Sequence, residues 1–181
     1  MATRFPHGPL PQRALQFPWD AIFLPLDAKM PASTTTASDR YTAASGLGSA
    51  IGEAARQYGL DLAPICAALD IDPEDFGNLT GRVSLDRLCR LLETCALITK
   101  DEAFALKSID YFRPGSSGPY GFGLMAAPTA LDFIRFMAEH SEYLSEKSYS
   151  KLTISNNSAE FVWTYSPLIL KRDQLVDMNI G

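Results

Sequence analysis

The chain has 181 residues, a length that corresponds to one globular domain with room for a tail. Its hydrophobic fraction of 46% and its charged fraction of 20% are ordinary for a protein with a packed core. Lys and Arg number 16 against 21 Asp and Glu, so the net charge is −5, and the longest basic run is Lys171-Arg172. Nucleic-acid binding by this chain alone is therefore not expected, because neutralising phosphates requires a basic face.

Three cysteines, Cys66, Cys89 and Cys95, lie in apolar periodic segments, and their odd number favours reduced, structural thiols. The sequence has no apolar run of about 18 residues, so no membrane span is expected. Prolines interrupt every apolar run near the N-terminus, which is not typical of a secretory signal. The sequence thus predicts a cytoplasmic protein with no membrane partner.

Residues 1–44 differ in composition from the rest of the chain. Six of the twelve prolines lie in the first 31 residues, and the polar stretch ASTTTASD follows them. This composition favours an extended or disordered chain, although Phe17 and Trp19 leave docking on the domain open. We therefore predict a disordered tail over residues 1–44 and one folded region over residues 45–181.

Five segments have apolar residues at helical spacing next to a capping or turn residue. They are 47–58 before Gly59, 62–71 after Asp61, 85–98 after Ser84, 102–112 after Asp101, and 130–144 after Thr129 in a Thr-x-x-Asp pattern. In these helices we expect Leu131 on the inner side and Arg87 in water. The first two resemble a helix-turn-helix outline, but residues 62–71 contain no Lys, Arg, Asn or Gln to read bases. Two packed core helices are the better interpretation.

Two alternating segments, YSKLTI and AEFVWTY, flank the turn-rich tetrapeptide Ser155-Asn156-Asn157-Ser158 and predict an antiparallel hairpin. Pairing Ile154 with Ala159 sets Leu152 opposite Phe161 and Ser150 opposite Trp163, which makes one face apolar and aromatic. Pro167 ends the hairpin, and a helical pattern follows it. We expect an α+β fold whose N-terminal helical layer packs on a small antiparallel sheet. Because two strands alone are marginally stable, we also expect that the chain is truncated before this sheet is complete.

The sequence offers no motif for catalysis or metal binding. Its two histidines, His7 and His140, have no nucleophile motif nearby, and no Cys-x-x-Cys or His-x-x-x-His spacing is present. The glycines of Pro114 to Thr129 have the wrong spacing for a phosphate loop, and a helix rather than a strand precedes them. We therefore expect neither an enzyme nor a cofactor. The clustered aromatic residues could be plain core or the wall of a small-molecule cavity.

The order of segments resembles the N-terminal effector-binding, or arabinose-binding-type, domain of AraC-family transcription regulators. The likeness covers residues 47–181, and its most specific part is PGSSGPYGFGLMAAPT, with Pro-Gly, two further glycines, an aromatic residue and Pro-Thr before a helix. Ser117 and Pro119 depart from the apolar residues more usual there. The Gly59-Leu60-Asp61 turn and the helix from Leu85 fit as well.

The resemblance implies a regulatory domain that binds a small effector and controls DNA binding, often as a homodimer, through a C-terminal domain that this chain does not contain. The expected pocket walls are the aromatic residues Tyr111, Tyr120, Phe122, Phe161 and Trp163. Gly118 and Gly121 are expected to be structural residues of the loop, at which the chain turns and packs closely against its neighbours. A ligand-free dimerisation or interaction module is the alternative, and a small enzyme is a third.

Overall fold

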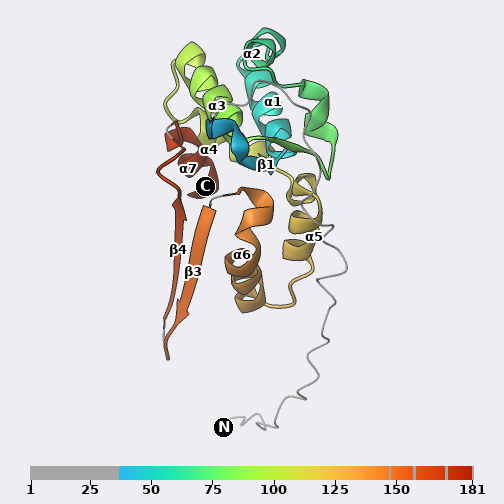
Figure 1. The fold of residues 1–181 in the computed structure, drawn as a ribbon. Coiled ribbons are helices and arrows are strands. Elements are labelled where there is room, and N and C mark those ends of the chain that lie inside the picture. Colours follow the sequence, from blue (N-terminus) through green and yellow to red (C-terminus); the bar gives the residue numbers. More distant parts are fainter. Residues whose placement is uncertain (1–36, 147, 157, 170, 181) are drawn as a thin grey trace, which may run out of the picture.

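The computed structural model describes residues 37–146, 148–156, 158–169 and 171–180 (Figure 1). In this part of the chain, helices predominate and strands form two small antiparallel sheets of two strands each. The α+β class predicted from the sequence is therefore confirmed. The predicted docking of Phe17 and Trp19 lies outside the described residues.

The helices of the described residues divide between two layers (Figure 1). Four α-helices and the C-terminal helix pack together in one layer: α1 (Leu47–Gln57), α2 (Ala63–Ala68), α3 (Leu85–Thr99), α4 (Phe104–Ser108) and α7 (Asp173–Ile180). The second layer places two helices beside the longer hairpin: α5 (Pro119–Met125) and α6 (Ala130–Leu144). Short 3-10 helices connect these elements: η2 (Ala37–Arg40), η3 (Pro73–Gly77), η4 (Ile109–Tyr111) and η5 (Pro114–Ser117).

The longer sheet is the predicted hairpin of β3 (Ser148–Ile154) and β4 (Ala159–Tyr165). Its register pairs Ile154 with Ala159, Leu152 with Phe161 and Ser150 with Trp163, so the predicted register is confirmed. The hairpin extends away from the helical layer alongside α6 (Figure 1). Its aromatic face consequently turns toward the interior, and its alternate residues face outward.

Helix α3 is the centre of the helical layer because its apolar residues are buried on several sides. Leu85, Leu88, Leu91 and Leu92 are fully buried. The Ser84 hydroxyl accepts a hydrogen bond from the Arg87 amide at 3.3 Å, which caps the first turn. Helix α7 packs against α3 and α4 and buries Leu175 completely. The last helix is thus part of the core of the layer.

Caps explain where the other helices begin and end. Thr129 Oγ1 accepts a hydrogen bond from the Asp132 amide at 3.1 Å, as the Thr-x-x-Asp pattern predicts, and α6 starts at the next residue. Helix α1 ends at Gln57, and two residues later Gly59 has a φ of +67°, in the left-handed region that glycine adopts easily. The Leu60 amide then donates to the Ala55 carbonyl at 2.9 Å and closes the turn.

The predicted tail over residues 1–44 is wrong for its last eight residues, because residues 37–44 are folded. Strand β1 (Thr42–Ala44) pairs with β2 (Arg82–Ser84), and Ala43 is fully buried. Residues 1–36 lie outside the described part of the chain. The sequence also predicted a single sheet, whereas the structure has two, because β1 and β2 pair separately from the hairpin.

Other local predictions also need correction. The glycine-rich stretch predicted as a turning loop forms η5 and α5, and the helix predicted over 102–112 is the shorter α4 followed by η4. Leu131 is 39% exposed, so it does not lie on the inner side of α6 as predicted. Arg87 does not simply face water, since its guanidinium forms ion pairs with Asp39 and Asp70.

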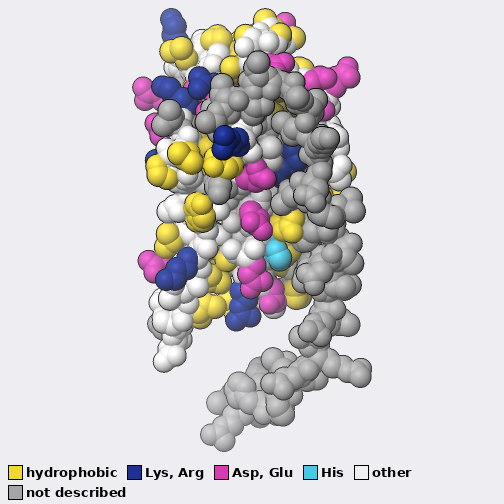
Figure 2. Space-filling model, in the orientation of Figure 1, with side chains coloured by type: hydrophobic (Ala, Val, Ile, Leu, Met, Phe, Trp, Pro, Cys, Tyr) yellow, Lys and Arg dark blue, Asp and Glu magenta, His cyan; other side chains and the backbone are white. Residues whose placement is uncertain are grey.

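The face of the molecule in Figure 2 shows Lys and Arg side chains scattered among Asp and Glu rather than gathered in one basic patch. This distribution agrees with the net charge of −5. None of the helices in the described part of the chain is long and apolar enough to span a membrane.

Candidate ligand-binding site

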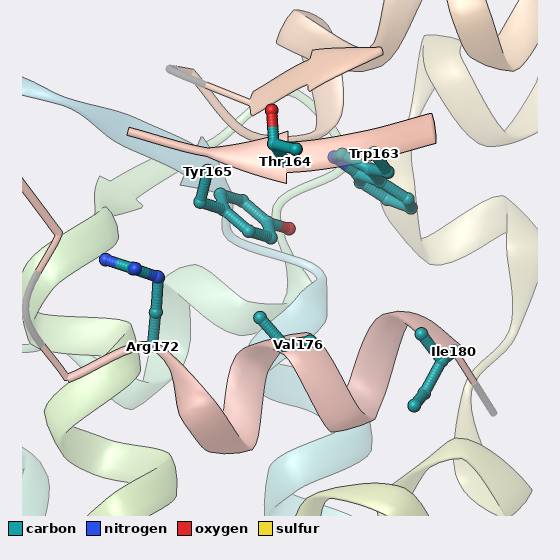
Figure 3. Close-up of a pocket in the computed structure, with 6 residues that line it drawn as sticks. All are labelled: Trp163, Thr164, Tyr165, Arg172, Val176 and Ile180. Carbon is teal, nitrogen blue, oxygen red and sulfur yellow. The ribbon is translucent and has the colours of Figure 1, made fainter. Parts of the chain in front are cut away.

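A hollow of about 340 Å³ lies between strand β4 and helix α7 (Figure 3). The strand contributes Trp163, Thr164 and Tyr165, and the helical side contributes Arg172, Val176 and Ile180. Its volume lies at the lower end of the range of small-molecule sites, roughly 300–1,000 Å³. We call this hollow the strand–helix pocket.

The aromatic residues on the inner face of β4 form a continuous row. The ring centroids of Phe161 and Trp163 are 6.3 Å apart, with the rings nearly perpendicular at 71°. Those of Trp163 and Tyr165 are 6.0 Å apart with a tilt of 30°. Both separations are typical of aromatic pairs that attract one another. The row therefore supplies a firm apolar wall, because residues of alternating position share one face of the strand.

Two buried polar atoms in this region have no hydrogen-bond partner among the described residues: the Tyr120 hydroxyl and Trp163 Nε1. Tyr120 is 3% exposed. A buried polar group without a partner costs about 1–3 kcal/mol, so native proteins rarely retain several together. Such groups are expected where a bound molecule or a water completes the hydrogen bonds.

Electrostatic influences show that these groups are neighbours. Burial raises the pKa of Tyr120 to about 12. Burial also raises the pKa of Tyr165, negative charge on Cys89 and, to a smaller extent, on Tyr120 would raise it further, and a hydrogen bond with the Ser145 hydroxyl partly offsets the rise. The Tyr165 hydroxyl accepts a hydrogen bond of 2.7 Å from Asn179 Nδ2 on α7. Elements α5, β4 and α7 and the residue that directly follows α6 thus bring four polar side chains into one interior region, where the tyrosines stay neutral at physiological pH.

A second, larger hollow of about 820 Å³ lies between η2, α2, η3 and the start of α3. Its wall carries three arginines, Arg40, Arg82 and Arg87, and four aspartates, and two of the arginines are already bonded to protein groups. Arg87 pairs with Asp39 and Asp70, while Arg82 donates to Thr42 and to the Tyr143 carbonyl.

Comparison with protein families matches residues 59–181 to the arabinose-binding domain of AraC transcription regulators, an N-terminal domain. The chain belongs to this family. It is therefore a regulatory domain of the ligand-sensing type, as the resemblance implied. No curated protein shows a significant match to the chain.

The arabinose-binding domain brings together only some of the predicted pocket residues. Trp163 lines the strand–helix pocket, Phe161 stands next to it in the aromatic row, and the Tyr120 hydroxyl lies near Tyr165. Tyr111 lies instead in η4, packed on the helical layer next to α1, so it is not part of this site. Phe122 is 50% exposed, because two residues along a helix turn it about 200° away from the buried Tyr120.

The two glycines singled out in the sequence lie at close backbone contacts. Gly118 has φ +63° and ψ −138°, and a Cβ added there would meet the Leu79 carbonyl oxygen at 1.8 Å. A Cβ at Gly121 would meet the Pro114 oxygen at 1.6 Å. Both glycines let α5 approach its neighbours and so position Tyr120.

Sequence reasoning missed the helical side of the pocket. Arg172, Val176 and Ile180 recur every four residues, which places them on one face of a helix. Tyr165 continues the alternation of Phe161 and Trp163 along the strand. Both patterns are present in the sequence, but only the tertiary structure shows that α7 faces β4. Among the residues that the structure describes, no group of three or more His, Cys, Asp or Glu side chains could hold a metal ion.

Proposed function

We propose that this domain binds a small-molecule effector between α7 and the aromatic face of the hairpin. The observation that carries the proposal is a pocket with an aromatic wall, in which the buried Trp163 Nε1 has no hydrogen-bond partner among the described residues. A ligand that supplies the missing hydrogen bond would stabilise the bound arrangement and shift the population toward it. Membership of the arabinose-binding family supports this role.

Helix α7 is the element through which such binding would act. It contributes Val176 and Ile180 to the pocket and buries Leu175 in the helical layer. A ligand that moves or rigidifies α7 would therefore alter the packing of both layers. We propose that this change controls a DNA-binding domain outside this chain, in a cytoplasmic regulator that acts as a dimer.

The role proposed is binding rather than catalysis. Within the described residues, the one histidine, His140, packs between the rings of Phe136 and Tyr143, at centroid distances of 4.5 and 6.0 Å. Cys89 and Cys95 are fully buried, and burial raises the pKa of each thiol to about 12. Thiols with a raised pKa are poor nucleophiles at neutral pH.

The test is a thermal-shift screen of the purified chain against a metabolite library, repeated with Trp163→Ala. A ligand that raises the melting temperature of the native protein, but not of the variant, would support binding at the aromatic row. Thr164→Ala is the matched control, because Thr164 lines the pocket from the adjacent position on β4 without belonging to the row. If no metabolite class shifts the native protein, the proposal fails.

A ligand-free dimerisation module is the second candidate, and exposed apolar residues favour it. At the end of α3, Leu97 is 78% exposed and Ile98 is 50% exposed. Light scattering of the native chain and of Leu97→Glu distinguishes the candidates. A dimer that the variant dissociates, together with a negative metabolite screen, would replace the sensor proposal with this one.

A further inference from the structure

We propose that the strand–helix pocket selects an anionic ligand, with a flat apolar body and one acidic group, and that Arg172 binds the acidic group. This inference rests on the proposed function and names the chemical class of its effector. Among the six residues that line the pocket, Arg172 is the only charged one. The remaining wall is aromatic, aliphatic or hydroxyl-bearing, so it can hold an apolar body but cannot neutralise a cation.

Arg172 differs from the other shielded arginines because it has hydrogen-bond donors left for a ligand. Arg87 forms ion pairs with Asp39 and Asp70, and Arg82 donates to protein oxygens from all three guanidinium nitrogens. Arg172 donates from Nη1 to the Ile169 carbonyl at 2.7 Å and forms no ion pair with a described carboxylate. A guanidinium presents five donors in a fork, so most of those of Arg172 are available to a carboxylate or sulfonate.

The layout of α7 defines where each part of the ligand would lie. Arg172 directly precedes α7, and Val176 and Ile180 follow it at intervals of four residues on the side of the helix that faces β4 (Figure 3). Arg172 stands at one end of this row, and the two aliphatic residues continue it for about 12 Å, at roughly 1.5 Å per residue. The acidic group would therefore bind at the start of α7, and the apolar body would lie between the aliphatic residues and Trp163.

Partial burial makes this single charge selective. Arg172 is half-buried, and charge-assisted hydrogen bonds are stronger where water is partly excluded. The chain as a whole carries a charge of −5, which disfavours non-specific attraction of anions. Anion binding at this pocket would therefore depend on Arg172 rather than on the general field of the protein.

The test uses two fluorescent probes with the same ring system: anilinonaphthalene sulfonate, which is anionic, and N-phenylnaphthylamine, which is uncharged. Each is titrated into the full chain and into Arg172→Gln, with Lys171→Gln as the control because Lys171 is the exposed neighbour outside the pocket. We expect Arg172→Gln to lower the affinity for the sulfonate probe by at least about tenfold, as for a lost charged hydrogen bond. The affinity for the neutral probe should not change. Lys171→Gln should change neither. Circular dichroism verifies that each variant is folded.

A salt titration of the native chain keeps the test independent of how well Arg172→Gln folds. Raising the salt concentration should lower the affinity for the sulfonate probe and leave the affinity for the neutral probe unaffected, because only the sulfonate probe forms an ion pair. Equal losses for both probes in Arg172→Gln, or no loss for the sulfonate probe, would overturn the proposal. If the neutral probe binds but the sulfonate does not, anion selectivity fails while ligand binding stands. If neither probe binds, the proposal falls, and a negative metabolite screen would then remove the sensor function as well.

Discussion

Replacing Tyr120 by Phe should make the unliganded protein more stable, which is the reverse of most changes in a core. The Tyr120 side chain is 3% exposed, and its hydroxyl has no partner among the described residues. Removing the hydroxyl relieves the cost of burying it unpaired, about 1–3 kcal/mol, and leaves the ring contact with Phe136 at 5.7 Å in place. In a domain of this size each kcal/mol corresponds to about 2–4 °C in melting temperature.

The same substitution at a neighbouring tyrosine supplies the control. The Tyr165 hydroxyl accepts a hydrogen bond from Asn179 Nδ2 at 2.7 Å, so Tyr165→Phe should cost about 1 kcal/mol. Urea unfolding followed by circular dichroism gives the free energy of unfolding for each variant. Opposite signs for the two variants support the assignment of an unpaired hydroxyl to Tyr120. Equal losses of stability in both would refute it, because they would mean that the Tyr120 hydroxyl has a partner in the folded protein.

Three further predictions concern Tyr120, Gly118 and Gln174. Because burial raises the pKa of Tyr120 from 10.0 to about 12, the unfolded chain releases this proton at a lower pH than the folded protein does, so the stability of the wild type falls as the pH rises from 10 to 12. Urea titrations should therefore show the wild type losing about 2 kcal/mol relative to Tyr120→Phe across that interval. Gly118→Ala should lower the free energy of unfolding by about 3 kcal/mol or more, since a Cβ would meet a backbone oxygen at 1.8 Å. Gly77→Ala is the control, and it should be nearly neutral in the same assay because the space around Gly77 is open. Gln174→Leu removes the acceptor of the buried Ala105 amide, a bond of 3.0 Å, and should lower stability by about 2 kcal/mol and accelerate hydrogen exchange at that amide.

Local chemistry explains why some elements could be predicted from the sequence in detail. The start of α6 depends on Thr129 and Asp132, which are three residues apart, and the hairpin register depends on a turn of four residues. In both places neighbours along the chain determine the structure, so pattern and capping rules are sufficient. The aromatic face of β4 was predictable for the same reason, because alternation alone places Phe161 and Trp163 together.

The parts that could not be predicted depend on contacts between distant residues. Strands β1 and β2 have three residues each and lie about 40 positions apart, so neither period nor turn signals their pairing. The ion pair of Arg87 with Asp39 likewise joins α3 to a segment predicted as a tail. Phe122 was predicted in the pocket because the stretch was interpreted as a loop. Once the stretch forms α5, the helical period turns Phe122 outward and Tyr120 inward.

Helix α7 connects the pocket to the helical layer because opposite sides of one short helix serve each of them. Val176 and Ile180 line the pocket, while Gln174 on the other side donates to the Glu102 carbonyl and accepts from the Ala105 amide at the start of α4. An eight-residue helix has no independent stability, so its position is determined by these two sets of contacts together. A ligand that adds contacts on the pocket side must therefore change the balance with the α4 side. In the proposed function, α7 is therefore the element that would couple ligand binding to the packing of the domain.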